Sequence, residues 1–161
     1  SSFDINTHHP IPFYTMSEDD SSEQDDVTFG TGTDPATTFT TAEGAGTRAS
    51  QITPFLWYVP DNIVIDAVTA IEGADTGTGD TTRMHLFSYG FTSGSTSCLT
   101  GGTLLAHNSD VTNAGSEQAY LTTWTVDSAP VAAGKVIMAF FRSDSVNSDY
   151  CVSITVKYHT N

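Results

Sequence analysis

Basic residues are scarce in this chain of 161 residues. Five Lys and Arg side chains stand against 19 Asp and Glu, so the formal net charge is −14. Proteins hold the nucleic-acid backbone with clustered Lys and Arg, and anionic membranes attract basic segments for the same reason. The charge balance therefore predicts that neither nucleic acid nor a membrane is a partner.

Cysteine and long apolar runs are also nearly missing. The two cysteines, Cys98 and Cys151, are too few for a disulfide framework. We expect two free thiols, with pairing across assembled strands as the alternative. No stretch approaches the ~20 apolar residues of a membrane-spanning helix. No Asn-x-Ser/Thr acceptor for glycosylation occurs, so nothing indicates eukaryotic secretion.

Familiar catalytic motifs are missing as well. The sequence has no Gly-x-Ser-x-Gly elbow, no P-loop, no His-Glu-x-x-His and no Gly-x-Gly-x-x-Gly that opens a helix. His85, His107 and His159 are scattered, which favours surface or interface roles. A catalytic triad assembled across the fold is the open alternative. We predict that the protein is not an enzyme and needs no cofactor.

Acidic runs are the remaining candidates for ligand binding. Residues 18–26 and 75–80 would supply the hard oxygen ligands that Ca²⁺ prefers. Neither run has EF-hand spacing, so we interpret both as solvated loops and keep calcium as the alternative. His8 and His9 are adjacent, so they point to opposite sides of an extended chain and do not chelate one metal together.

Strand-forming residues are what the chain has in quantity. Thr, Val, Ile and aromatic residues are common, whereas straight-chain helix formers are few. From residue 51 onward, short apolar segments alternate with turn sequences, and residues 149–159 alternate apolar and polar with a period of two. We predict an all-β antiparallel two-sheet sandwich over residues 51–161. A jelly roll is the favoured connectivity, because it accommodates long loops and hides strand edges.

The first fifty residues differ from the rest. Pro10 and Pro12 bar a helix and favour an extended path, and residues 1–50 hold too few apolar side chains to fold alone. We predict an extended N-terminal arm with short strands, which lies across a neighbouring subunit or the surface of a larger assembly. A disordered tail is the alternative. The predicted anchor residues of the arm are Ile11, Phe13, Tyr14 and Met16.

The segment 83–91 is apolar on both faces. Met84 and Leu86 share one face, and the other holds Phe87, Tyr89 and Phe91. A strand of this kind is covered on both sides, here by the N-terminal segment or by a neighbouring subunit. We expect the second face to be an interface and the protein to self-associate, with a cyclic homotrimer favoured.

Aromatic side chains raise the possibility of carbohydrate binding. Trp57, Tyr58 and Trp124 could stack on sugar rings. They lie inside predicted strands, however, where core packing is the more common role. A host-glycan-binding domain of the tail-fibre or tailspike type is therefore the alternative function.

Three segments carry a resemblance to a known class of protein. They are residues 57–63 (WYVPDNI), 133–137 (AGKVI) and 152–158 (VSITVKY). These phrases resemble virion structural proteins of marine tailed bacteriophages, in particular proteins that decorate or cement the capsid. The resemblance implies a β-sandwich on the outer surface of the virion, no cofactor and no catalysis. Its implied partner is the major capsid protein or another virion protein, and the resemblance supplies no catalytic residues.

Overall fold

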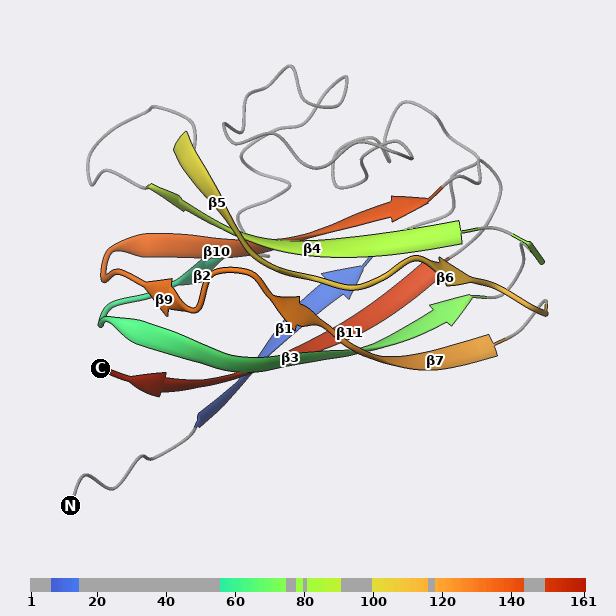
Figure 1. The fold of residues 1–161 in the computed structure, drawn as a ribbon, viewed down its shortest axis with the longest axis horizontal. Helices are drawn as coiled ribbons and strands as arrows, with labels where there is room; N and C mark the ends of the chain where they lie inside the picture. Colours follow the sequence, from blue (N-terminus) through green and yellow to red (C-terminus); the bar gives the residue numbers. More distant parts are fainter. Residues whose placement is uncertain are drawn as a thin grey trace.

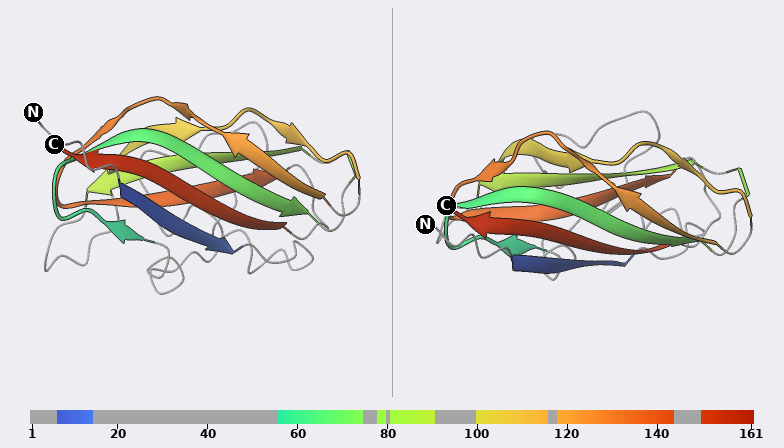
Figure 2. Two further views of the ribbon diagram at one scale, coloured as in Figure 1. Left: turned by 90° about the horizontal axis from the view of Figure 1, so that it is seen from below. Right: turned by 60° about the horizontal axis from the view of Figure 1, so that its bottom comes forward.

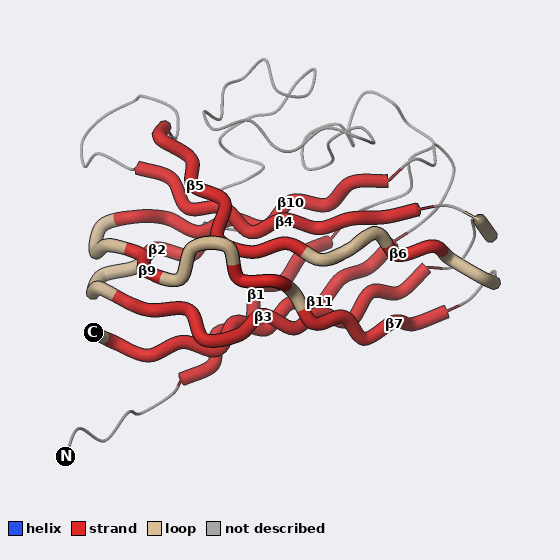
Figure 3. The backbone as a smooth tube through the Cα atoms, in the orientation of Figure 1, coloured by secondary structure: helices blue, strands red, loops and turns tan. Residues whose placement is uncertain are grey.

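The computed structural model describes residues 7–14, 56–74, 78–79, 81–90, 100–115, 118–143 and 150–161. Within this part of the chain every regular element is a strand (Figure 3). All strand pairs are antiparallel. The strands form two sheets. The predicted all-β, antiparallel two-sheet architecture is confirmed. A helix able to span a membrane is not found among the described residues.

Consecutive strands along the chain belong almost alternately to one of two sheets, here named A and B (Figure 1). Sheet A contains, in order, β1 (Thr7–Tyr14), β11 (Tyr150–Thr160), β3 (Ile63–Ala74) and β7 (Gln118–Thr123), with β9 (Pro130–Val131) also paired to β3. Sheet B contains, in order, β2 (Trp57–Tyr58), β10 (Lys135–Ser143), β4 (Thr81–Gly90), β5 (Thr100–His107) and β8 (Thr125–Val126), with β6 (Val111–Thr112) also paired to β4.

The main core lies between the sheets. Strand alternation sends one face of each long strand inward, and the inward residues are aliphatic with one tryptophan. They include Val68 and Ala70 of β3, Leu86 of β4 and Ile154 of β11, all almost fully buried. Trp124 closes this core after β7, so the core role expected for it is confirmed.

A second apolar layer covers the outer face of sheet B. Phe87 and Tyr89 of β4 pack there with Phe140 and two further residues of β10, Val136 and Met138. The rings of Phe87 and Phe140 meet edge to face at a centroid distance of 5.9 Å. Both faces of β4 are therefore buried, as its two-sided apolar pattern predicts.

The N-terminal strand β1 belongs to the sandwich. It pairs antiparallel with β11 along its whole length, from Thr7 opposite Tyr158 to Tyr14 opposite Cys151. Figure 2 shows β1 in blue beside β11 in red, with β3 in green next to them. The extended conformation agrees with the two prolines. The pairing differs from the predicted arm across a neighbouring subunit, because the open edge of β11 offers backbone partners within the same chain.

A β-bulge divides β3. The register with β11 shifts between Lys157 and Tyr158, which face Ala67 and Ile65, so Asp66 is an extra residue. A one-residue insertion turns every later side chain to the opposite face. Ile63 and Ile65 point into the core before the bulge, whereas Val68, Ala70 and Glu72 point inward after it.

Candidate interaction surfaces

The outer face of sheet B does not offer the interface expected from the sequence. The side chains of Phe87 and Tyr89 are 3% and 0% exposed within this single chain. Two partly buried residues, Leu56 and Leu104, pack against them. Coverage within one chain was one of the two alternatives for this face, so the burial removes the motive for a trimer built on it. Phe91, the third residue of the set, lies outside the described residues.

Three of the four predicted anchor residues of the arm lie in β1. Ile11, Phe13 and Tyr14 lie in β1, where their backbones face Ile154, Val152 and Cys151 of β11. Met16 lies outside the described residues. The structure therefore pairs these three residues with β11 in sheet A, whereas Phe87 and Tyr89 of β4 lie in sheet B.

The outer face of sheet A carries an apolar pair that sequence analysis missed. Ile71 of β3 and Leu121 of β7 are direct cross-strand partners, and their side chains are 53% and 73% exposed. Thr69 and Thr123 form the adjacent outward pair. Ser153 of β11 faces Ile71 from the other side. We call this uncharged band the Ile71–Leu121 face.

The bulge at Asp66 explains why this face was missed. A strict period of two from Ile63 and Ile65 places Ile71 inside the sandwich and Glu72 outside it. The extra residue reverses that assignment, so the isoleucine is exposed and the carboxyl is buried. A run of β-branched residues does not by itself mark the position of a bulge. Local rules are broken mainly where function or strain requires it, which draws attention to this face.

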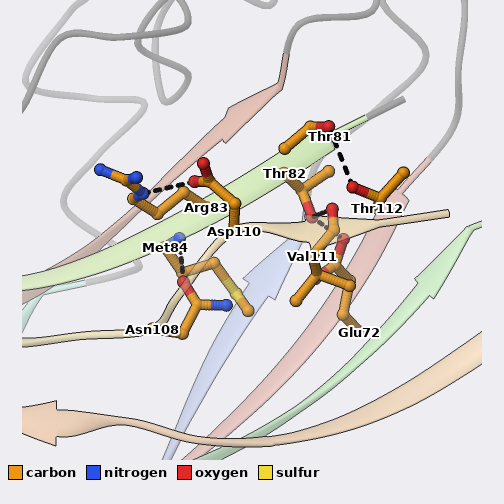
Figure 4. Close-up of polar contacts among 9 residues, drawn as sticks. All are labelled: Glu72, Thr81, Thr82, Arg83, Met84, Asn108, Asp110, Val111 and Thr112. Atoms are coloured by element: carbon orange, nitrogen blue, oxygen red, sulfur yellow. Dashed lines mark hydrogen bonds and ion pairs between the residues drawn. The ribbon is translucent and has the colours of Figure 1, made fainter. Parts of the chain in front are cut away.

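The buried carboxyl of Glu72 lies between the sheets (Figure 4). The hydroxyl of Thr82 donates to its Oε1 atom at 2.5 Å, and Oε2 has no hydrogen-bond partner within the described part of the chain. Burial raises the pKa of the Glu72 carboxyl, and the Thr82 hydrogen bond offsets part of that rise. The charged carboxylate is therefore less favourable here than in water.

Neighbouring polar side chains fix the loop between β5 and β6. The backbone N–H of Met84 donates to the Asn108 side-chain oxygen at 2.6 Å. Nearby, the guanidinium of Arg83 meets Asp110 at 2.5 Å on the surface (Figure 4). These contacts join β4 to the loop that follows β5, and each has an evident structural role.

Two histidines form surface pairs with aspartates. His107 Nδ1 lies 2.7 Å from Asp127, and His159 Nδ1 lies 2.9 Å from Asp66. The rings of His107 and His85 stack at 6.5 Å. His107 and His159 are partly exposed, in agreement with the surface role expected for them. His85 is only 2% exposed, so the surface position expected for it is wrong.

Metal binding finds no geometric support in the part of the chain that the structure describes. No three His, Cys, Asp or Glu side chains come together there in a metal-binding arrangement. The acidic run at 18–26 lies outside the described residues, and so do Asp75, Asp80 and Cys98. The calcium and disulfide alternatives therefore stay predictions.

The three aromatic residues considered for sugar stacking differ in their exposure. Trp124 is buried, and Trp57 is half-buried against Tyr158 at a centroid distance of 5.1 Å. Tyr58 of β2 is 57% exposed. Of the three, Tyr58 is the ring that a planar ligand could reach.

The chain matches no protein-family model and no curated protein.

Proposed function

We propose that this chain is a non-enzymatic structural protein that attaches to the outer surface of a phage capsid, as a decoration or cement protein. The observation that carries the proposal is the Ile71–Leu121 face, where two large apolar side chains stand exposed side by side. Exposed apolar groups gathered on a polar surface mark protein contacts. Three strand-and-turn segments resemble capsid decoration proteins, which suggests that the partner at this contact is a virion protein.

The proposed partner is the major capsid protein or another virion protein. The residues around Ile71 are uncharged, so like-charge repulsion with a capsid surface is smallest at this face. We place the anchor on this face rather than on the arm, because residues 7–14 already pair with β11. The jelly roll remains our proposed connectivity, supported by the frequent alternation of consecutive strands between the two sheets.

Attachment is tested with undecorated particles of the virus that encodes the chain. The purified protein should co-sediment with these particles and raise their resistance to heat. Ile71→Asp should weaken both effects, because it places a charge in the contact. Ala133→Asp is the matched control, since it adds the same charge at an exposed turn between β9 and β10. Absence of binding by the unaltered protein would contradict the proposal.

A host-glycan-binding domain of the tail-fibre type is the second candidate, and the exposed ring of Tyr58 favours it. Sugar faces stack on such rings. A glycan array probed with this chain distinguishes the two functions, because a decoration protein should bind no glycan there. Binding that is lost in Tyr58→Ala would support the second candidate.

A further inference from the structure

Sheet A ends in two edge strands with opposite chemistry. At one edge β1 contains Pro10 and Pro12. Proline has no N–H, so both residues fit an edge strand when their nitrogens face away from β11. The outer edge of β1 then lacks N–H donors at two alternate positions. Proline is one of the devices that prevent edge-to-edge pairing of sheets.

The opposite edge, β7, has none of these devices. Its sequence, Gln118–Thr123, contains no proline, no charged residue and no bulge. In the described part of the chain β7 pairs only with β3. Edge strands in soluble proteins are usually protected by Lys, Pro or a bulge, so an unprotected edge in a protein of charge −14 is unusual.

Hydrogen bonding after β7 shows which of its backbone groups face outward. The Trp124 N–H donates to the Val68 carbonyl at 2.9 Å. The register of β7 with β3 is regular, and the bonding direction alternates with each residue. Tyr120 and Thr122 therefore bond to β3. The N–H and C=O groups of Ala119, Leu121 and Thr123 point to the open edge.

The same three residues have exposed side chains, so the open edge and the outer face meet at Leu121. In an antiparallel pair, opposed residues point to the same face. A second copy of β7 can therefore pair with Ala119 opposite Thr123 and Leu121 opposite its own counterpart. Three pairs with two bonds each give about six new backbone hydrogen bonds. This register uses every outward-facing group of the strand.

We propose that β7 forms an antiparallel strand pair with β7 of a second copy of this chain, about a two-fold axis at Leu121. Sheet A then continues from one copy into the next. The cross-strand row Ile71–Leu121 is extended by Leu121 and Ile71 of the second copy, so four apolar side chains lie in one row across the dimer.

Charge supports a second copy as the occupant of this edge. Two molecules of charge −14 repel each other, and the repulsion is smallest where the facing segments carry no charge. Antiparallel self-pairing of Gln118–Thr123 brings no charged side chains of β7 together. A two-fold contact also closes on itself, so it limits assembly to a dimer rather than a fibre.

This dimer is tested separately from the proposed attachment to a capsid. It uses the backbone edge of β7, whereas attachment uses the outer face of the same sheet; the two contacts share Leu121. Sedimentation of the isolated chain reads the dimer, and co-sedimentation with undecorated particles reads attachment. A dimer would also present two such faces on one continuous sheet.

Sedimentation velocity of the purified full chain across a series of concentrations tests the proposal. We expect a reversible monomer–dimer equilibrium. Leu121→Pro removes one outward N–H without removing a bond to β3, and it should leave a monomer. Leu121→Lys should do the same, because two opposed lysines repel. Thr155→Lys is the control. It adds the same charge at an exposed position of β11, on the same face of sheet A but away from the edge, and this variant should still dimerise.

A monomer at every concentration overturns the proposal, and so does a trimer. Persistence of the dimer in both Leu121→Pro and Leu121→Lys also overturns it. Circular dichroism of each variant confirms the β-fold, and Leu121→Lys keeps the test decisive if the proline variant does not fold.

Discussion

The two edge strands of sheet A, β1 and β7, differ in whether a further strand can pair with them. β1 carries two prolines that block further pairing, whereas β7 is an uncharged six-residue strand with free backbone groups and an exposed leucine. A sandwich that blocks one edge and leaves the other open directs association to a single place.

Removal of β1 should have the largest effect, because it replaces the proline-containing edge of sheet A by the open edge of β11. A chain that begins at residue 15 loses the eight-residue strand and opens the edge of β11. Cross-strand pairs contribute roughly 0.2–1 kcal/mol each, so we expect a loss of about 2–8 kcal/mol. Urea unfolding followed by circular dichroism measures it. An unchanged midpoint would mean that residues 7–14 act as a free arm instead.

Truncation of Phe87 and of Leu121 compares the buried layer on sheet B with the exposed face of sheet A. Phe87→Ala should lower the free energy of unfolding by about 3–5 kcal/mol, because the side chain is buried against Phe140. Leu121→Ala should change it by less than about 0.5 kcal/mol in the monomer, since this leucine is exposed. Denaturant unfolding at low protein concentration compares the two. Equal small effects would indicate that Phe87 belongs to an interface between subunits.

The sequence predicts the fold class well and the interaction surfaces poorly. Period-two alternation in residues 149–159 and the two-sided apolar pattern around Phe87 are visible without coordinates. The strand β11 (Tyr150–Thr160) and the burial of both faces of β4 confirm them. The exposure of Ile71 was not predictable, because the bulge at Asp66 depends on register with β11. The edge position of β7 depends on strand order, which no local pattern specifies.

The buried carboxyl of Glu72 on β3 gives a pH-dependent prediction. The pKa of Glu72 is raised in the folded state, so its contribution to stability is fully present below the unfolded-state value near 4.5. That contribution is lost as pH rises through the folded-state pKa. Glu72→Gln removes the ionisation, so it should unfold at higher denaturant than the unaltered protein at alkaline pH.

Asp61→Asn is the control for this change, because it removes an exposed carboxylate of the same charge. Unfolding midpoints of the three proteins from pH 4 to pH 9 provide the comparison. A Glu72→Gln curve parallel to that of the unaltered protein would show that Glu72 does not titrate in this way.

The smallest expected effect comes from unblocking β1. Replacing Pro10 and Pro12 together by Thr restores two N–H donors at that edge. We expect weak additional association beyond the dimer at high concentration, visible as larger species in sedimentation. The same double substitution in a Leu121→Lys chain should show this association alone. No change in either background would mean that the prolines do not protect the edge.

Amide hydrogen exchange at single-residue resolution tests the central claim most directly. The N–H groups of Tyr120 and Thr122 bond to β3, so they should be protected at every protein concentration. The N–H groups of Ala119, Leu121 and Thr123 should exchange rapidly in dilute solution and become protected as concentration rises. Rapid exchange of Leu121 at all concentrations would contradict pairing at β7.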